Sequence, residues 1–162
     1  MQKIDPRCFH ILTYGMYIVS SKLGDKLNAQ IANTVFQTTS EPPQISVSIN
    51  KQNLTHQYIS ESKVFGVSVL DETADLEFIG IFGFRSGRNF DKLAQIKYKL
   101  GTTGVPLILE HTLSLLEAEV VESLDAGTHT VFLGTIKSAE LLKEGNPMTY
   151  YYYHKVVKGK AP

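Results

Sequence analysis

The sequence predicts a mainly β protein, an antiparallel barrel or sandwich with a few short helices. Residues 44–50 alternate strictly between apolar and polar, as in a strand that buries one face. YGMYIVSS (14–21) alternates likewise, and the turn-like KLGDKLN (22–28) joins it to a segment that begins near Ala29. These observations predict a hairpin and a strand with one face in the core.

Further β-rich runs and capping residues extend this pattern. Residues 64–70, 113–121 and 129–141 are rich in strand-forming side chains, and the turn-like ESLDAGT joins the last two. Short helices are expected behind capping residues, namely Asn53 or Thr55 before 56–62, Thr73 before 74–82 and Asn89 before 90–96. We expect the helices to decorate a β core.

The chain has the size and composition of one domain. Its 162 residues, 43% of them hydrophobic, are enough for a substantial core. No internal repeat or linker interrupts it, and only HKVVKGKAP (about 154–162) has the polar composition of a loosely held tail. A single domain over residues 1–162 is therefore expected.

Charge and cysteine content exclude several classes of function. Sixteen basic residues balance sixteen acidic ones without a basic block, which argues against a nucleic acid or an anionic membrane as partner. Polar residues interrupt CFHILTYGMYIVSS (8–21), so it predicts neither a signal peptide nor a membrane span. The single cysteine, Cys8, excludes an internal disulfide and a thiolate metal cluster, and we expect it to be a buried thiol. Small-molecule chemistry in the cytoplasm is the expectation.

Motifs for several common chemistries are missing from the sequence. The glycines of GIFGFRSGR (80–88) do not form a dinucleotide-binding fingerprint, and there is no phosphate-binding P-loop motif. The five histidines lack metal-binding spacing, and no nucleophile elbow occurs. We therefore expect no protein metal site.

Residues 31–55 are crowded with neutral hydrogen-bonding side chains. Only Glu41 and Lys51 are charged in this run, whereas a surface loop normally carries more charge. A pocket for a flat, partly apolar ligand needs neutral donors and acceptors among apolar walls, and NTVFQTTS (33–40) offers both. The alternative is a solvated loop between two strands.

Several segments together resemble the flavin reductase-like family. LTYGMYIVSS, the run from Asn28 to Ile59, FGVSVL, EFIGIFGFRSG, GVPLI and DAGTHTVFLGTI occur in the family's order and spacing. The chain is most similar to the branch with ferric reductases, flavoredoxins and the flavin domains of high-molecular-weight rubredoxins. The resemblance implies an antiparallel Greek-key split β-barrel that binds FMN, a homodimer with flavin near the subunit interface, and hydride transfer from NADH or NADPH.

The resemblance also implies where the flavin lies. It places the ring along Asn33, Thr34, Val35, Phe36, Gln37 and Thr38. It places the phosphate where a strand ends and a helix begins, at Ser48, Asn50, Lys51, Thr55 and His56. Hydroxyl groups, one cation and a helix N-terminus at that point suit a phosphate dianion. A capped helix with an exposed lysine is the alternative.

Three further features have two interpretations each. Arg85 is a candidate cation for phosphate or nicotinamide, or an ordinary surface arginine. The family motif around His129 projects its histidine toward flavin and nicotinamide, where it would orient the nicotinamide or tune the flavin's charge; the alternative is a structural histidine. The tyrosines 150–153 either close over the partner subunit's flavin or form an edge strand.

Two functional hypotheses remain. The first is an FMN-dependent NAD(P)H oxidoreductase whose electrons go to an external acceptor, a ferric chelate, a flavin or a redox protein such as rubredoxin. The acceptor is expected to be external because no C-x-x-C pair follows the tail. The second is a non-enzymatic FMN electron carrier of the flavoredoxin type, reduced by a protein partner. No ribose-reading motif distinguishes NADH from NADPH.

Overall fold

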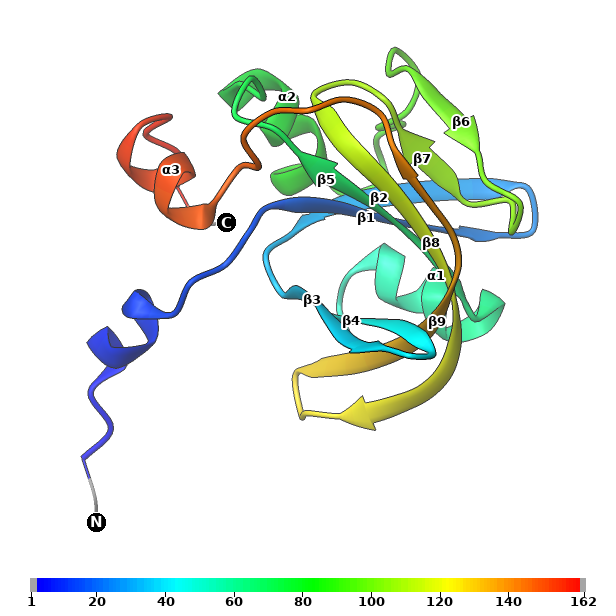
Figure 1. The fold of residues 1–162 in the computed structure, drawn as a ribbon, viewed down its shortest axis with the longest axis horizontal. Coiled ribbons are helices and arrows are strands. Elements are labelled where there is room, and N and C mark those ends of the chain that lie inside the picture. The colour runs from blue at the N-terminus through cyan, green and yellow to red at the C-terminus, as the bar shows by residue number, and fades with distance from the viewer. Residues whose placement is uncertain (1–2, 161–162) are drawn as a thin grey trace.

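The computed structural model describes residues 3–160 and is built around one antiparallel sheet that curls into a split barrel (Figure 1). The strand order is β2-β1-β5-β8-β9-β4-β3. The strands are β1 (Tyr17–Leu23), β2 (Lys26–Ala32), β3 (Val35–Ser40), β4 (Pro43–Asn50), β5 (Val64–Leu70), β8 (Thr112–Asp125) and β9 (His129–Leu141). A separate pair, β6 (Tyr98–Leu100) and β7 (Pro106–Ile108), lies beside it. No helix in the described residues is long and apolar enough to cross a bilayer.

The structure confirms the predicted β framework. The hairpin predicted from residue 14 onward is β1–β2, and the alternating segment 44–50 is β4, whose apolar side chains are buried. The connection from β4 to β5 brings β5 beside β1, and the long connection from β5 to β8, which includes β6 and β7, places β8 on the other side of β5. The β8–β9 hairpin then brings β9 beside β4. These crossings close the sheet around an apolar interior, as expected for an antiparallel barrel.

Two apolar cores lie on opposite faces of the β1–β2 hairpin. The barrel interior is filled by residues such as Val19, Phe65 and Phe132. The second core packs Ile18 and its neighbours against helices α2 (Leu76–Gly83) and α3 (Tyr150–Lys155). Because β1 and β2 are covered on both faces, the polar side chains of Ser20, Ser21 and Asn28 are buried on them, and buried polar groups normally have hydrogen-bond partners.

Helix α1 (Leu54–Ser62) starts where expected, after Asn53, and the helix predicted at 74–82 is α2, but its predicted cap and the helix predicted at 90–96 are wrong. The N-cap of α2 is Asp75, which accepts a hydrogen bond from the Phe78 amide at 2.8 Å, because the Thr73 hydroxyl is engaged with Asp71 and His111. Residues 90–96 form turns rather than a helix. There the Asp91 carboxylate accepts from the Leu93 amide at 3.0 Å, and a local side-chain bond of this kind competes with helix formation.

Both ends of the chain differ from expectation. Residues 150–155 form α3, capped by Thr149, so the edge-strand alternative is wrong. The segment expected as a loose tail returns to this helix, since the Tyr153 hydroxyl donates to the Lys160 carbonyl at 2.9 Å; residues 1–2 and 161–162 lie outside the described part. Cys8 is exposed rather than buried, because the short 3₁₀ helix η1 (Pro6–Ile11) buries none of its residues.

A buried carboxylate, Glu117 on β8, holds the turn between β6 and β7. Its two oxygens accept four hydrogen bonds of 2.8–2.9 Å from the amides and hydroxyls of Thr102 and Thr103. Burial alone would raise the pKa of the Glu117 carboxyl, but the four donors together outweigh it and lower that pKa. Glu117 is therefore an ionised anchor for this turn.

Glu117→Gln is expected to lower the free energy of unfolding by about 1–3 kcal/mol at pH 7, because a neutral amide cannot accept the same four bonds. Since the folded-state pKa is depressed, the wild-type contribution is complete above the unfolded value and is lost as the pH falls through the folded one. Urea denaturation of both proteins at pH 7, and again at about pH 3, measures this difference. Exposed Glu119→Gln on the same strand is the control, and an equal loss in both variants contradicts the assignment.

Candidate functional site

A pocket of about 400 Å³ opens where β2, the start of α1 and the segment after α2 meet. Its walls come from three stretches of the chain that are far apart in the sequence. The lining residues are Asn28, Gln30, Ile31, Gln52, Asn53, Leu54, Thr55, Phe82, Gly83, Phe84, Arg85, Ser86, Gly87, Arg88 and Lys92. None of these lining residues is acidic, and three are cationic.

The β2 wall is held to α1 by a buried polar pair. The Asn28 amide donates to the Thr55 hydroxyl at 2.8 Å, and both side chains are buried. A Cβ atom at position 87 would lie 2.0 Å from the Asn28 side-chain oxygen, so only glycine allows the loop after α2 to approach this closely. The pair and the glycine fix the shape of the pocket floor.

One buried polar atom at the pocket lacks a hydrogen-bond partner within the described part of the chain, and the cap residue of α1 makes no cap bond. The Gln30 side-chain oxygen is buried without a hydrogen bond, while its nitrogen donates to the Ile31 carbonyl at 3.3 Å. Asn53, the N-cap residue of α1, makes no side-chain cap bond. Buried polar groups are normally satisfied, so a ligand with its own hydrogen-bonding groups would complete this site.

Three cations give the pocket a positive field. Arg88 donates to the Gln52 carbonyl at 3.0 Å, and the Arg85 guanidinium lies 4.3 Å from the ring centroid of Phe90. The buried Lys92 ammonium donates to the carbonyls of Ala29, at 2.9 Å, and Phe82, at 3.2 Å, and burial lowers the pKa of Lys92 to about 8. Neutral carbonyls do not compensate its charge, so the donor set suits an anion.

A larger cavity of about 870 Å³ adjoins this pocket. Asn28, Leu54, Gly87, Arg88 and Lys92 line both spaces, so Arg88 and Lys92 stand at the boundary between them. The larger cavity also contains carboxylates, from Asp25 and Asp91. The positive field without acidic neighbours therefore belongs to the smaller pocket.

Several residues predicted to bind the flavin lie outside the pocket. They share the outer face of the sheet, the face opposite the barrel interior. Cross-strand partners project to the same side, and one row runs from Leu133 through Ser46 to Phe36. The next row on that face runs from Val131 to Ser48, whose amide donates to the Thr34 carbonyl, and the following pair is His129 and Asn50. The Thr38 and Ser46 hydroxyls, 2.7 Å apart, belong to the same face.

The segment 33–38 is mostly a strand. From Val35 onward it forms β3, the edge strand of the sheet, so the solvated-loop alternative is wrong. Val35 points into the barrel, whereas Phe36 and Gln37 are exposed. Asn33 lies in the link from β2, and its side-chain oxygen accepts from the Thr34 hydroxyl at 3.1 Å. This link connects the pocket residues of β2 with the outer face.

Of the five residues predicted for the phosphate, the structure brings only Thr55 to the pocket. Lys51 is engaged elsewhere, since its ammonium binds the carboxylate of Asp125, the last residue of β8, at 2.6 Å. His56 pairs with the Thr130 hydroxyl at 2.7 Å and packs on Phe132. Burial and the charge of Lys51 lower the pKa of His56, which keeps it neutral near pH 7.

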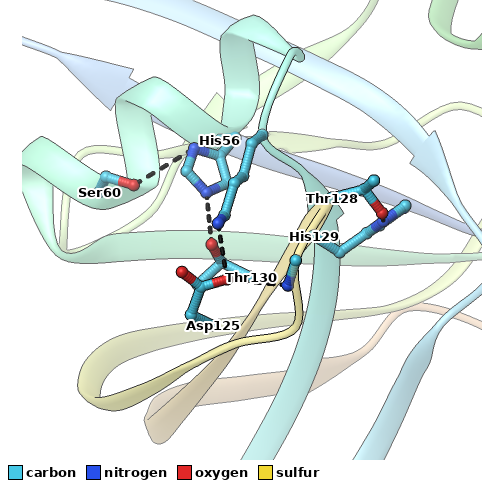
Figure 2. A network of polar contacts seen from close by, with 8 residues as sticks. His56, Ser60, Asp125, Thr128, His129 and Thr130 are labelled. Atoms are coloured by element: carbon cyan, nitrogen blue, oxygen red, sulfur yellow. Dashed lines mark hydrogen bonds and ion pairs between the residues drawn. The ribbon is translucent and has the colours of Figure 1, made fainter.

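His129 stands apart from this network. Its Nδ1 atom lies 2.8 Å from the Thr128 hydroxyl, and the ring is partly exposed on the outer face of β9 (Figure 2). Arg85 lines the pocket, and its role as a cation for phosphate or nicotinamide stays a prediction. No local pattern singles out Asn28, Gln30 or Lys92, whereas Arg88 could have been found beside Arg85.

Comparison with known proteins agrees with this architecture. The family model described as flavin reductase like domain matches residues 9–160. The chain is 53% identical over 159 residues to high molecular weight rubredoxin from Moorella thermoacetica, with 98% of this chain and 69% of the relative covered. It is 48% identical over 159 residues to ferric-chelate reductase (NAD(P)H) from Archaeoglobus fulgidus, with 98% and 94% covered.

A solved structure shows the same fold. The FMN-binding protein from Thermus thermophilus, with bound p-hydroxybenzaldehyde, matches with a TM-score of 0.77 and 27% identity, over 88% of this chain and 79% of that chain. A TM-score of this size over most of both chains shows that they share one fold. From the family match over residues 9–160 and the two close relatives, we conclude that this chain belongs to the flavin reductase-like family.

Proposed function

We propose that this protein is an FMN-dependent NAD(P)H oxidoreductase that passes electrons to an external acceptor. The observation that carries the proposal is the pocket at the start of α1, which has three cations, a buried amide oxygen without a partner and a cap residue that makes no cap bond, and no acidic lining residue. That donor set fits a ligand with a phosphate group and neutral hydroxyls, which describes FMN.

Particular residues are suited to each part of the cofactor. Arg88, Lys92 and the first-turn amides of α1 would hold the phosphate, with the Asn53 side chain available as a further donor. The Gln30 oxygen is an acceptor for a ribityl hydroxyl. Beyond the pocket, Asn33–Thr38 would lie along the flavin ring, because the link from β2 to β3 leads from the pocket to the outer face of the sheet.

Bound FMN supplies the hydride acceptor and can release the electrons to another molecule. The role of the chain's own residues is to bind and orient the flavin and the nicotinamide, because hydride transfer to a flavin needs no protein acid or base. We propose that His129 positions the nicotinamide over the outer face. The relatives' names motivate the choice of acceptor, since one is a ferric-chelate reductase and another a rubredoxin, and a free flavin remains a third candidate. The proposal includes a cytoplasmic homodimer.

The purified protein is expected to be yellow and to be bleached rapidly near 450 nm when NADH or NADPH is added without oxygen. Stopped-flow absorbance with each nucleotide measures the rate and gives the preference between them. A yellow protein that neither nucleotide bleaches, but that dithionite reduces, contradicts the enzyme and favours a flavoredoxin-type electron carrier.

Arg88→Gln is expected to weaken FMN binding about tenfold or more while riboflavin binding changes little, because a charge-assisted hydrogen bond is worth roughly 1.5–3 kcal/mol. Fluorescence titration of the apoprotein with both ligands measures this. Lys51→Gln is the matched control, since Lys51 pairs with Asp125 outside the pocket. A larger FMN loss in Lys51→Gln than in Arg88→Gln would move the phosphate to the site first predicted from the sequence.

His129→Ala should keep the fold and the yellow colour but slow flavin reduction by NAD(P)H. A displacement of the hydride donor by about 1 Å costs on the order of a hundredfold in rate. Dithionite reduction, which needs no nicotinamide site, should stay at the wild-type rate. If NADH and NADPH reduce the FMN-loaded variant as fast as the wild type, His129 has no part in the reaction.

A further inference from the structure

The larger cavity of about 870 Å³ has no part in the binding of FMN as proposed above. It lies between the β1–β2 hairpin, helix α1 and the segment that leads from α2 to β6. Its volume is more than twice that of the smaller pocket and falls within the range of about 300–1,000 Å³ that small-molecule sites occupy. The cavity therefore has room for a second ligand group beside the phosphate.

The charge of the site changes with distance from the smaller pocket. Arg88 and Lys92 stand at the boundary, because they line both spaces. Beyond them, the larger cavity adds one cation, Lys26, and two carboxylates, Asp25 and Asp91. Carboxylates accept hydrogen bonds from ribose hydroxyls and repel phosphate. An anionic group is thus favoured at the boundary, and a neutral group with hydroxyls is favoured beyond it.

The walls of the larger cavity suit a flat aromatic ring. Phe90 and Tyr98 line it and are 36% and 37% exposed, so their rings are accessible to a ligand. Leu93 and Ile96 add apolar surface beside them. Nucleotide bases stack on aromatic side chains of this kind, whatever the base, because every base has a π-face. The cavity can therefore take an adenine ring.

Polar groups at the cavity are left without partners among the described residues. Tyr58, on α1, lines the cavity and is only 6% exposed, and its hydroxyl makes no hydrogen bond to another described residue. Asp91 accepts from the Leu93 amide at 3.0 Å through one oxygen, which leaves its second oxygen available. Buried polar groups are normally satisfied, so a ligand with ring nitrogens and hydroxyls would complete these two side chains.

We propose that the larger cavity takes the adenosine half of FAD, with the pyrophosphate at Arg88 and Lys92. The proposal rests on the proposed function, since the second nucleotide extends from the flavin phosphate in the smaller pocket. The pyrophosphate carries two negative charges, which the two boundary cations match. The adenine ring lies against Phe90 and Tyr98, and a ribose hydroxyl donates to Asp91. FAD is thus held in both spaces, whereas FMN fills only the smaller one.

Ala94→Trp tests the assignment by filling the larger cavity. Ala94 is exposed in a turn and lines this cavity but not the smaller pocket. Isothermal titration calorimetry of the apoprotein measures the dissociation constants of FAD and FMN. We expect the wild type to bind FAD about tenfold or more tightly than FMN, because adenosine adds contacts in a preformed cavity, and the variant to lose this difference. Gln95→Trp, exposed in the same turn and outside both linings, is the matched control.

Tyr58→Phe is a second variant, which keeps the buried ring and removes only the hydroxyl. It should weaken FAD binding about three- to tenfold and leave FMN binding unchanged, as expected for the loss of one hydrogen bond. A wild-type protein that binds FAD no more tightly than FMN, or an Ala94→Trp variant that weakens both flavins equally, overturns the proposal. If Ala94→Trp leaves FAD binding unchanged but raises the KM for NADH, the cavity takes the adenosine of the nicotinamide nucleotide and the assignment to FAD is wrong.

These binding measurements are independent of hydride transfer. If Ala94→Trp selectively weakens FAD but neither NADH nor NADPH reduces the bound flavin, the proposed enzyme fails and the FAD site stands. If the nucleotides reduce the FMN-loaded protein rapidly but Ala94→Trp affects FAD and FMN alike, the enzyme stands and the FAD site fails. Each outcome therefore decides one proposal without the other.

Discussion

The buried ammonium of Lys92 is the interaction on which the candidate site depends. Lys92 is only 6% exposed, and its two carbonyl partners belong to β2 and to the end of α2, so one side chain joins both walls of the pocket. Carbonyl dipoles satisfy its hydrogens but not its charge, and a buried cation without a counter-ion is costly. Because Arg85 and Arg88 line the same pocket, an anionic ligand would compensate the charge of all three cations.

The lowered pKa of Lys92 also makes the stability of the fold depend on pH. Its ordinary value is 10.5 and its folded value about 8, so the unfolded chain binds more protons between these limits. The stability of the protein therefore rises with pH through that window. Below the window, the buried charged ammonium lowers the stability of the ligand-free protein. A bound anion would raise the folded pKa and remove the penalty. Ligand affinity and fold stability are thus coupled at one side chain.

Sequence reasoning succeeded where local pattern determines structure. Strict alternation predicted β4, and the neutral run 31–55 identified a stretch that touches both pocket and sheet face. It failed where distant residues compete for a side chain: Lys51 is held by Asp125, 74 residues away. Lys92 was not predicted as a site residue, because residues 90–96 were expected to form a helix on the outside of the β core. They form a turn instead, and the Lys92 side chain is buried. The hydrogen bond between Asn28 and Thr55 forms only when β2 and α1 pack together, so the local sequence pattern does not predict it.

The central claim is that this pocket is built for the phosphate of FMN, and the protonation of Lys92 reports it most directly. NMR of the labelled Lys92 side chain can follow its titration in the apoprotein and with either FMN or riboflavin bound. The account predicts a pKa of about 8 in the apoprotein, a clearly higher value with FMN and little change with riboflavin. An equal rise with both ligands, or no rise with FMN, would contradict it.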